Sequence, residues 1–201
     1  MNLRLSIAII LVAAALGGCR YESFADPKVS ALDAEYIGQV PNFPVDREYE
    51  RYRIDYASSE SPGTIVIDTK SNFLYLVEPN QKAIRYGVAT GSEAAGWTGV
   101  ARIGRKAEWP HWMPPADMLE RWPHLKPTAD AGGLPGGPDN PLGARALYLF
   151  DGNKDTLYRI HGTNEPEKIG HSVSSGCIRM RNIDVIDLYN RVPIGARVVV
   201  I

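Results

Sequence analysis

The sequence has little cysteine, almost no net charge and no apolar run long enough to cross a membrane. Its net charge is −1 over 201 residues, which gives no support to a nucleic-acid-binding protein or a basic membrane face. The apolar run at 5–16 is shorter than the about 20 residues of a spanning helix. Neither a Walker A nor a GxGxxG motif occurs. Two cysteines and four histidines lack the spacing of a metal site, so neither a metal nor a cofactor is expected.

What remains is typical of a folded, loop-rich β protein. Hydrophobic residues make up 44% and charged residues 22% of the chain, which also contains 15 prolines and 19 glycines. Short apolar runs separated by turn residues predict a mainly β fold, an antiparallel sandwich or barrel-like sheet with one or two short helices. A Pro-, Gly- and Trp-rich stretch, 91–143, is expected to be a long loop with a short helix at 115–121. The expected strands are 64–68, 73–77, 83–90, 144–150, 156–161 and 197–201, and the main helix is 183–191, capped by Asn182.

The first 19 residues read as an export signal. Arg4 precedes the apolar run, which indicates a secretory signal peptide. The four residues that end at Cys19 also resemble a bacterial lipobox, which implies a lipid anchor on Cys19 and a periplasmic location. Ordinary signal-peptidase cleavage is the alternative. Residues 20–61 are expected to be a tether and approach segment, with a short strand or extended arm at 49–56.

One local segment carries the candidate chemistry. Cys177 follows His161 within a stretch rich in glycine and polar residues, and a thiol needs a nearby base to react at neutral pH. Gly176 leaves room for a substrate carbonyl to approach backbone N–H donors. A disulfide between the two cysteines is the alternative in an oxidising compartment, but lipidation of Cys19 would leave Cys177 as a lone thiol.

Three other histidines compete with His161 as the base. His111 and His124 lie in the Pro- and Trp-rich loop, where exposure or simple hydrogen bonding is expected. His171 is the stronger rival because it lies six residues before Cys177.

The two halves of this segment resemble the signature of the L,D-transpeptidase catalytic domain family (YkuD, with ErfK and YbiS). The chain reads His-Gly-Thr-Asn at 161–164 and Ser-Ser-Gly-Cys-Ile-Arg-Met at 174–180. The resemblance extends over 62–201, which is therefore expected to be the catalytic domain. Many relatives have a histidine where this chain has Ser175, and that difference puts rate and substrate preference in doubt.

The resemblance implies roles for individual residues. Cys177 is the expected nucleophile and His161 the general base and acid, its second ring nitrogen held by a backbone carbonyl. The backbone of Ser175, Gly176 and Cys177 is the expected oxyanion hole. The expected substrate-binding residues are Ser174, Arg179, Trp109 and Trp112. A structural ion pair is an equal alternative for Arg179, and covering the barrel end is one for the tryptophans.

The implied reaction is acyl transfer in peptidoglycan. The enzyme would cleave the bond between the third residue and D-Ala of a stem tetrapeptide, then pass the acyl group to an amine. The acceptor would be another stem, giving a 3→3 cross-link, or an envelope protein. An L,D-carboxypeptidase and a non-catalytic peptidoglycan-binding lipoprotein are the alternatives. A protein-directed cysteine peptidase is disfavoured because papain-like local signatures are missing.

Overall fold

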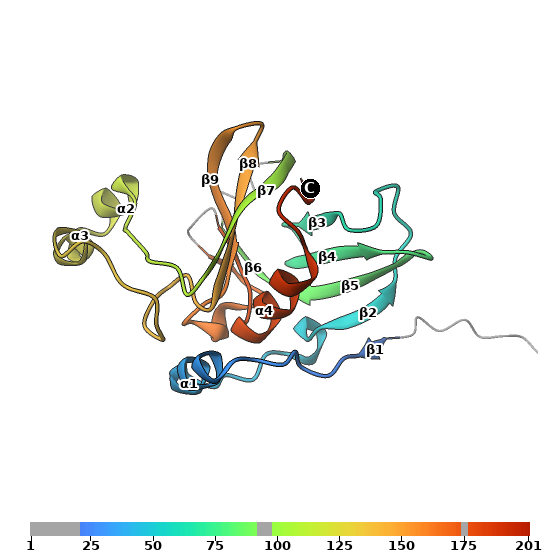
Figure 1. Ribbon diagram of the computed structural model, residues 1–201, viewed down its shortest axis with the longest axis horizontal. Helices are drawn as coiled ribbons and strands as arrows, with labels where there is room; N and C mark the ends of the chain where they lie inside the picture. The colour runs from blue at the N-terminus through green and yellow to red at the C-terminus, as the bar shows by residue number, and fades with distance from the viewer. Residues whose placement is uncertain (1–20, 92–97, 174–176) are drawn as a thin grey trace, which may run out of the picture.

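The computed structural model describes residues 21–91, 98–173 and 177–201, and the chain is mainly β, as predicted. Its strands join in one sheet, in the order β1-β2-β5-β4-β3-β12-β7-β8-β9-β11-β6-β10. Figure 1 shows β2 to β5 on one side, β7 to β9 on the other, and helix α4 (Asn182–Arg191) below the junction. The strands are β1 (Glu22–Ser23), β2 (Tyr52–Asp55), β3 (Ile65–Asp68), β4 (Phe73–Glu78), β5 (Lys82–Gly87), β6 (Ala89–Gly91), β7 (Gly99–Glu108), β8 (Arg145–Asp151), β9 (Lys154–His161), β10 (Ser172–Val173), β11 (Ile178–Arg179) and β12 (Arg197–Val200).

The expectation of an antiparallel sheet holds for most strand pairs but not for all. Strand β12 pairs in parallel with β3, β11 with β9, and β10 with β6. A short hairpin cannot connect strands in parallel, and none of these three pairs is joined by one. The parallel β9–β11 pair matters most, because it brings the two halves of the sequence motif side by side.

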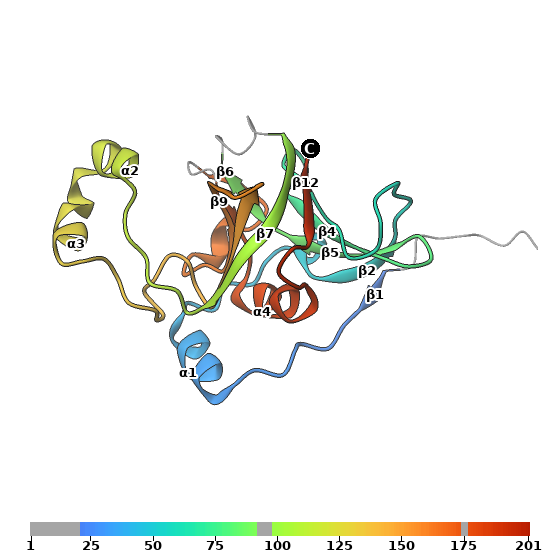
Figure 2. The ribbon, with the colours of Figure 1, turned by 45° about the horizontal axis from the view of Figure 1, so that its top comes forward.

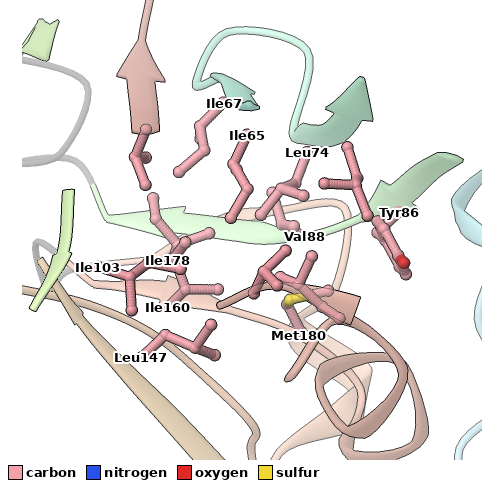
Figure 3. Packing of buried hydrophobic residues seen from close by; sticks show 14 of the residues in the cluster. Ile65, Ile67, Leu74, Tyr86, Val88, Ile103, Leu147, Ile160, Ile178 and Met180 are labelled. Atoms are coloured by element: carbon pink, nitrogen blue, oxygen red, sulfur yellow. The ribbon is translucent and has the colours of Figure 1, made fainter. Parts of the chain in front are cut away.

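The core lies between the sheet and α4. Side chains alternate along a strand, so Leu74 and Leu76 of β4 and Ile84 and Tyr86 of β5 all point inward and are buried. Figure 3 shows Leu74 and Tyr86 in one cluster with Ile160, Ile178 and Met180 of the motif segment. The Tyr86 hydroxyl donates to Asp187 Oδ2 of α4 at 2.7 Å, which satisfies the one polar atom of that ring. The motif strands β9 and β11 thus pack on the main core through Ile160 and Ile178.

The prediction that 91–143 is a long loop is wrong for its first part. Strand β7 (Gly99–Glu108) lies there, between β12 and β8. The glycines and charged residues of β7 interrupt the apolar alternation that would predict a strand. Its pairing with β12 on one edge and β8 on the other supplies the stabilisation that the local sequence lacks. Gly104 lies where the β7–β8 register shifts, against the Phe150 ring.

Beyond β7 the chain forms an arm. Helix α2 (Ala116–Arg121), the 3-10 turn η3 (Pro123–Leu125) and helix α3 (Lys126–Asp130) lie well away from the sheet (Figures 1 and 2). The short helix expected at 115–121 is confirmed by α2.

The expected tether contributes to the fold from residue 21 onward. Strand β2 pairs with β5 and β1 with β2, which confirms the strand alternative for 49–56. Helix α1 (Ala31–Gln39) begins at Ser30 with a capping box: the Ser30 hydroxyl accepts from the Asp33 amide, and Asp33 accepts from the Ser30 amide. A 3-10 turn, η1 (Arg47–Tyr49), leads into β2, and another, η4 (Pro166–Lys168), follows β9. In the part of the chain described, no helix has the length and apolarity needed to cross a membrane.

Candidate active site

The register of β9 and β11 places the two motif residues on one face of the sheet. Ile178 pairs with Ile160 and Arg179 with His161, and both isoleucines are buried in the core. Because neighbouring side chains point to opposite faces, His161 lies on the face away from that core. Cys177, directly before β11, lies on the same face, opposite Arg159.

His161 is held in one orientation and one protonation state. Its side chain is buried, and Nδ1 lies 2.6 Å from the Gly162 carbonyl oxygen. A carbonyl can only accept, so Nδ1 carries the hydrogen and Nε2 keeps a free lone pair. The predicted backbone acceptor is therefore present. Burial, reinforced by the positive charges of Arg179 and Arg159, lowers the pKa of His161 to about 3, against the opposing effect of the Gly162 hydrogen bond.

Cys177 is a free, half-buried thiol that directly precedes β11, the strand next to the one that carries His161. Burial raises the pKa of the Cys177 thiol, while a backbone hydrogen bond from Arg159 and the charges of Arg159 and Arg179 oppose that rise. Both members of the pair are thus neutral at rest. A thiol beside a neutral imidazole with a free Nε2 is suited to transfer its proton as it attacks a carbonyl.

Asn182 fixes the backbone that carries His161. Its Oδ1 accepts from the Ala144 amide at 3.0 Å and the Thr163 amide at 3.1 Å, and its Nδ2 donates to the Thr163 carbonyl at 2.9 Å. The predicted helix cap is thus wrong, because Asn182 is the first residue of α4 and Arg181 is the N-cap. Gly143 lies against the same oxygen with φ +59°, where a Cβ would collide with Asn182.

The other predicted residues fall into three groups. Arg179 forms an ion pair with Glu165 at 2.8 Å. The Trp109 indole donates to Asp33 of α1 at 2.8 Å, and the Trp112 amide bonds the Leu134 carbonyl in a small bridge. The remaining predicted residues lie outside the described part of the chain: Cys19, Ser174, Ser175 and Gly176.

The rival histidines gain no support as the base. His111, His124 and His171 are all exposed, and none shares the register of Cys177 and His161.

Two contributors to the site had no clear sequence signal. Asp33 reaches Arg145, at the start of β8, from more than a hundred residues earlier in the chain. The Ser30-x-x-Asp33 pattern predicts a helix start but not this contact. The sequence around Asn182 predicts a helix cap, whereas its side chain bonds the backbone of Ala144 and Thr163.

The fold and site define a mainly β protein that pairs a thiol with a buried, neutral histidine on adjacent parallel strands. The model of the L,D-transpeptidase catalytic domain family matches residues 62–200, and the chain belongs to this family.

Named relatives agree with this membership. The chain is 34% identical over 140 residues to a probable L,D-transpeptidase ErfK/SrfK of Escherichia coli, covering 68% of this chain and 43% of that protein. It is 34% identical over 138 residues to the putative L,D-transpeptidase YqjB of Bacillus subtilis, covering 68% and 69%. The chain thus spans less than half the length of the enterobacterial relative.

A solved structure covers more of the chain. A crystal structure from Brucella melitensis, described as a probable carnitine operon oxidoreductase, is 48% identical with a TM-score of 0.52. The match covers 84% of this chain and 99% of that one.

Proposed function

We propose that this protein is a peptidoglycan L,D-transpeptidase with Cys177 as nucleophile and His161 as general base and acid. The observation that carries the proposal is the fixed tautomer of His161, whose free Nε2 lies on the face that Cys177 shares. Membership of the family supplies the reaction class. The substrate is a stem tetrapeptide, cleaved between its third residue and D-Ala.

The first half-reaction forms a thioester. The Cys177 thiol gives its proton to His161 Nε2, and sulfur attacks the carbonyl carbon. Backbone N–H groups of 175–177 hold the oxyanion, and the guanidinium groups of Arg159 and Arg179 favour its negative charge. The tetrahedral intermediate then expels D-Ala, whose amine takes the proton from His161.

The second half-reaction passes the acyl group on. An acceptor amine gives a proton to His161 and attacks the thioester carbonyl, and sulfur leaves and regains its proton. An amine of another stem gives a 3→3 cross-link, and a lysine of an envelope protein gives anchoring. Water in the same place gives an L,D-carboxypeptidase.

The substrate also sets the compartment. Peptidoglycan lies outside the inner membrane, which accords with export by the signal at 1–19. We place the protein on the periplasmic side of the envelope, held by lipid on Cys19. Globomycin treatment of cells that produce the protein should leave the lipidated precursor uncleaved, and Cys19→Ala should abolish incorporation of labelled palmitate.

Two other activities compete with this proposal. A non-catalytic peptidoglycan-binding lipoprotein would need neither a thiol nor an oriented imidazole. An oxidoreductase activity is suggested only by the description of the Brucella melitensis protein. The family match over 62–200 favours acyl transfer for this chain.

The deciding experiment incubates the full chain with disaccharide-tetrapeptide and analyses the products by mass spectrometry. Cys177→Ala is the control for the nucleophile and His161→Asn for the base. Loss of D-Ala with formation of a dimer, both abolished in Cys177→Ala, supports transpeptidation. Tripeptide without dimer indicates a carboxypeptidase, and unchanged substrate that stays bound to the protein indicates the binding module.

A further inference from the structure

The arm that carries α2 and α3 leaves and rejoins the sheet at a narrow neck. It begins after Trp109, at the end of β7, and ends at Ala144, just before β8. The Trp109 amide donates to the Ala144 carbonyl at 2.8 Å and joins the two sides. Trp109 has φ +39°, a strained value for a bulky residue that surrounding contacts must hold. The neck is therefore a point where the position of the arm is set.

Asp33 of α1 holds both sides of this neck. Its Oδ1 accepts from the Trp109 indole at 2.8 Å and from Arg145 Nη1 at 2.9 Å, and its Oδ2 accepts from Arg145 Nη2 at 2.9 Å. The Tyr36 ring, one turn further along α1, packs edge-on against Trp109. Asp33 and Arg145 are only 3% and 5% exposed. Such a bidentate pair fixes geometry as well as charge.

The contact continues to the catalytic histidine. Arg145 Nη1 also donates to the Ala144 carbonyl at 2.8 Å, and the Arg145 carbonyl accepts from the Gly162 amide at 3.0 Å. The Gly162 carbonyl in turn orients His161 Nδ1. The backbone of Arg145 and Gly162 thus links the Asp33–Arg145 ion pair to the Gly162 carbonyl, which sets the direction of His161 Nε2.

Asp33 lies outside the part of the chain that the family model matches. That match begins at residue 62, whereas Asp33 belongs to the segment before it. Without Asp33, Arg145 would keep a buried charge whose only other acidic neighbour, in the part of the chain described, is the exposed Glu108 at 3.7 Å. A buried charge without its partner is strongly unfavourable, so the start of β8 would have to shift to solvate it.

We propose that Asp33 is a positioning residue for His161, acting through Arg145 and Gly162, and that it also clamps the neck of the arm at Trp109. The N-terminal segment thereby completes the active site that the downstream domain carries. The catalytic consequence of this clamp rests on the proposed function, but the state of the thiol–imidazole pair does not. The test therefore reads Cys177 directly.

The experiment measures alkylation of Cys177 by iodoacetamide across pH in the full chain. Wild type, Asp33→Asn and His161→Ala are compared well below the melting temperature of each. Cys19 is replaced by Ala throughout so that one thiol is followed, by mass spectrometry. His161→Ala gives the rate without a base, about 100-fold or more below wild type at neutral pH. Asp33→Asn is expected to lose at least about tenfold near neutral pH, with its profile shifted to higher pH and its high-pH limit unchanged.

A matched control separates positioning from general loosening. Arg53→Gln also breaks an ion pair of the N-terminal segment, between Arg53 and Glu78 at 2.6 Å, far from His161. Its alkylation profile should match wild type. If Asp33→Asn misfolds, Trp109→Phe removes one of the four hydrogen bonds that the Asp33 carboxylate accepts and should give a smaller shift in the same direction.

The outcomes separate cleanly. A wild-type profile for Asp33→Asn overturns the proposal, and so does an equal shift in Arg53→Gln. An enzyme that turns over no tetrapeptide but still shows the Asp33-dependent profile loses the proposed function and keeps the clamp. If wild type turns over tetrapeptide but the Asp33→Asn alkylation profile is unchanged, the proposed function stands and the clamp is refuted.

Discussion

The buried neutral histidine makes a prediction about folding stability as well as about catalysis. The pKa of His161 is about 3 in the folded chain, against an ordinary value of 6.5. The unfolded chain therefore binds a proton at His161 in acid that the folded chain does not. This contribution to stability is present in full above the unfolded pKa and is lost as the pH falls below it.

The size of the effect follows from the two pKa values. Between about pH 7.5 and about pH 4.5 His161 stays neutral in the folded chain, while in the unfolded chain it becomes protonated. The loss is about 1.4 kcal/mol for each pH unit below 6.5, or about 2.7 kcal/mol at pH 4.5. That is a large share of the about 5–15 kcal/mol by which folded proteins are stable.

Urea unfolding, followed by tryptophan fluorescence, measures this loss when wild type is compared with His161→Asn at both pH values. The Asn amide can still donate to the Gly162 carbonyl but does not titrate. Other groups titrate in both proteins, so the difference between the two pH dependences isolates His161. We expect wild type to lose about 2.7 kcal/mol more than the variant. Parallel pH dependences would refute a buried, neutral His161.

Three further predictions concern the same site. Acylation of Cys177 by a carbapenem should stay constant from neutral pH down to about pH 5, since His161 remains a free base there; a fall centred near pH 6.5 in stopped-flow traces would contradict this. Gly143→Ala should destabilise the fold by about 2 kcal/mol more than Gly152→Ala in thermal unfolding, because both glycines have positive φ but only Gly143 abuts Asn182. Asn182→Ala leaves two buried backbone amides without an acceptor and should cost about 2–4 kcal/mol in urea unfolding; a loss within about 0.5 kcal/mol would show that water replaces the side chain.

Features set by nearby residues could be predicted from the sequence. The β4 and β5 runs alternate apolar side chains that the structure buries, and the helix at 183–191 needs only the spacing of its own apolar face. The proximity in the fold of the segments that carry Cys177 and His161 could also be expected, because one short stretch contains both residues; their catalytic roles stay a prediction.

Features that depend on distant residues could not be predicted. Strand β7 has glycine at two positions and charges at others, so only its neighbours β12 and β8 make it a strand. Asp33 satisfies a helix cap in its own sequence, and nothing local indicates that its carboxylate also pairs with Arg145. In both cases the deciding partner lies far along the chain, and sequence periodicity carries no information about it.

The electrostatics of the site favour a neutral resting pair. Burial keeps both Cys177 and His161 neutral before substrate arrives. The positive charges of Arg159 and Arg179 disfavour an imidazolium at His161 and favour a thiolate at Cys177 or an oxyanion beside it. A resting thiolate–imidazolium pair would gain little from them, because the two effects oppose each other. In the proposed mechanism each attack forms an oxyanion, which the arginines stabilise, together with an imidazolium, which they disfavour. The arginines therefore favour the passage of the proton from His161 to the leaving group in both half-reactions.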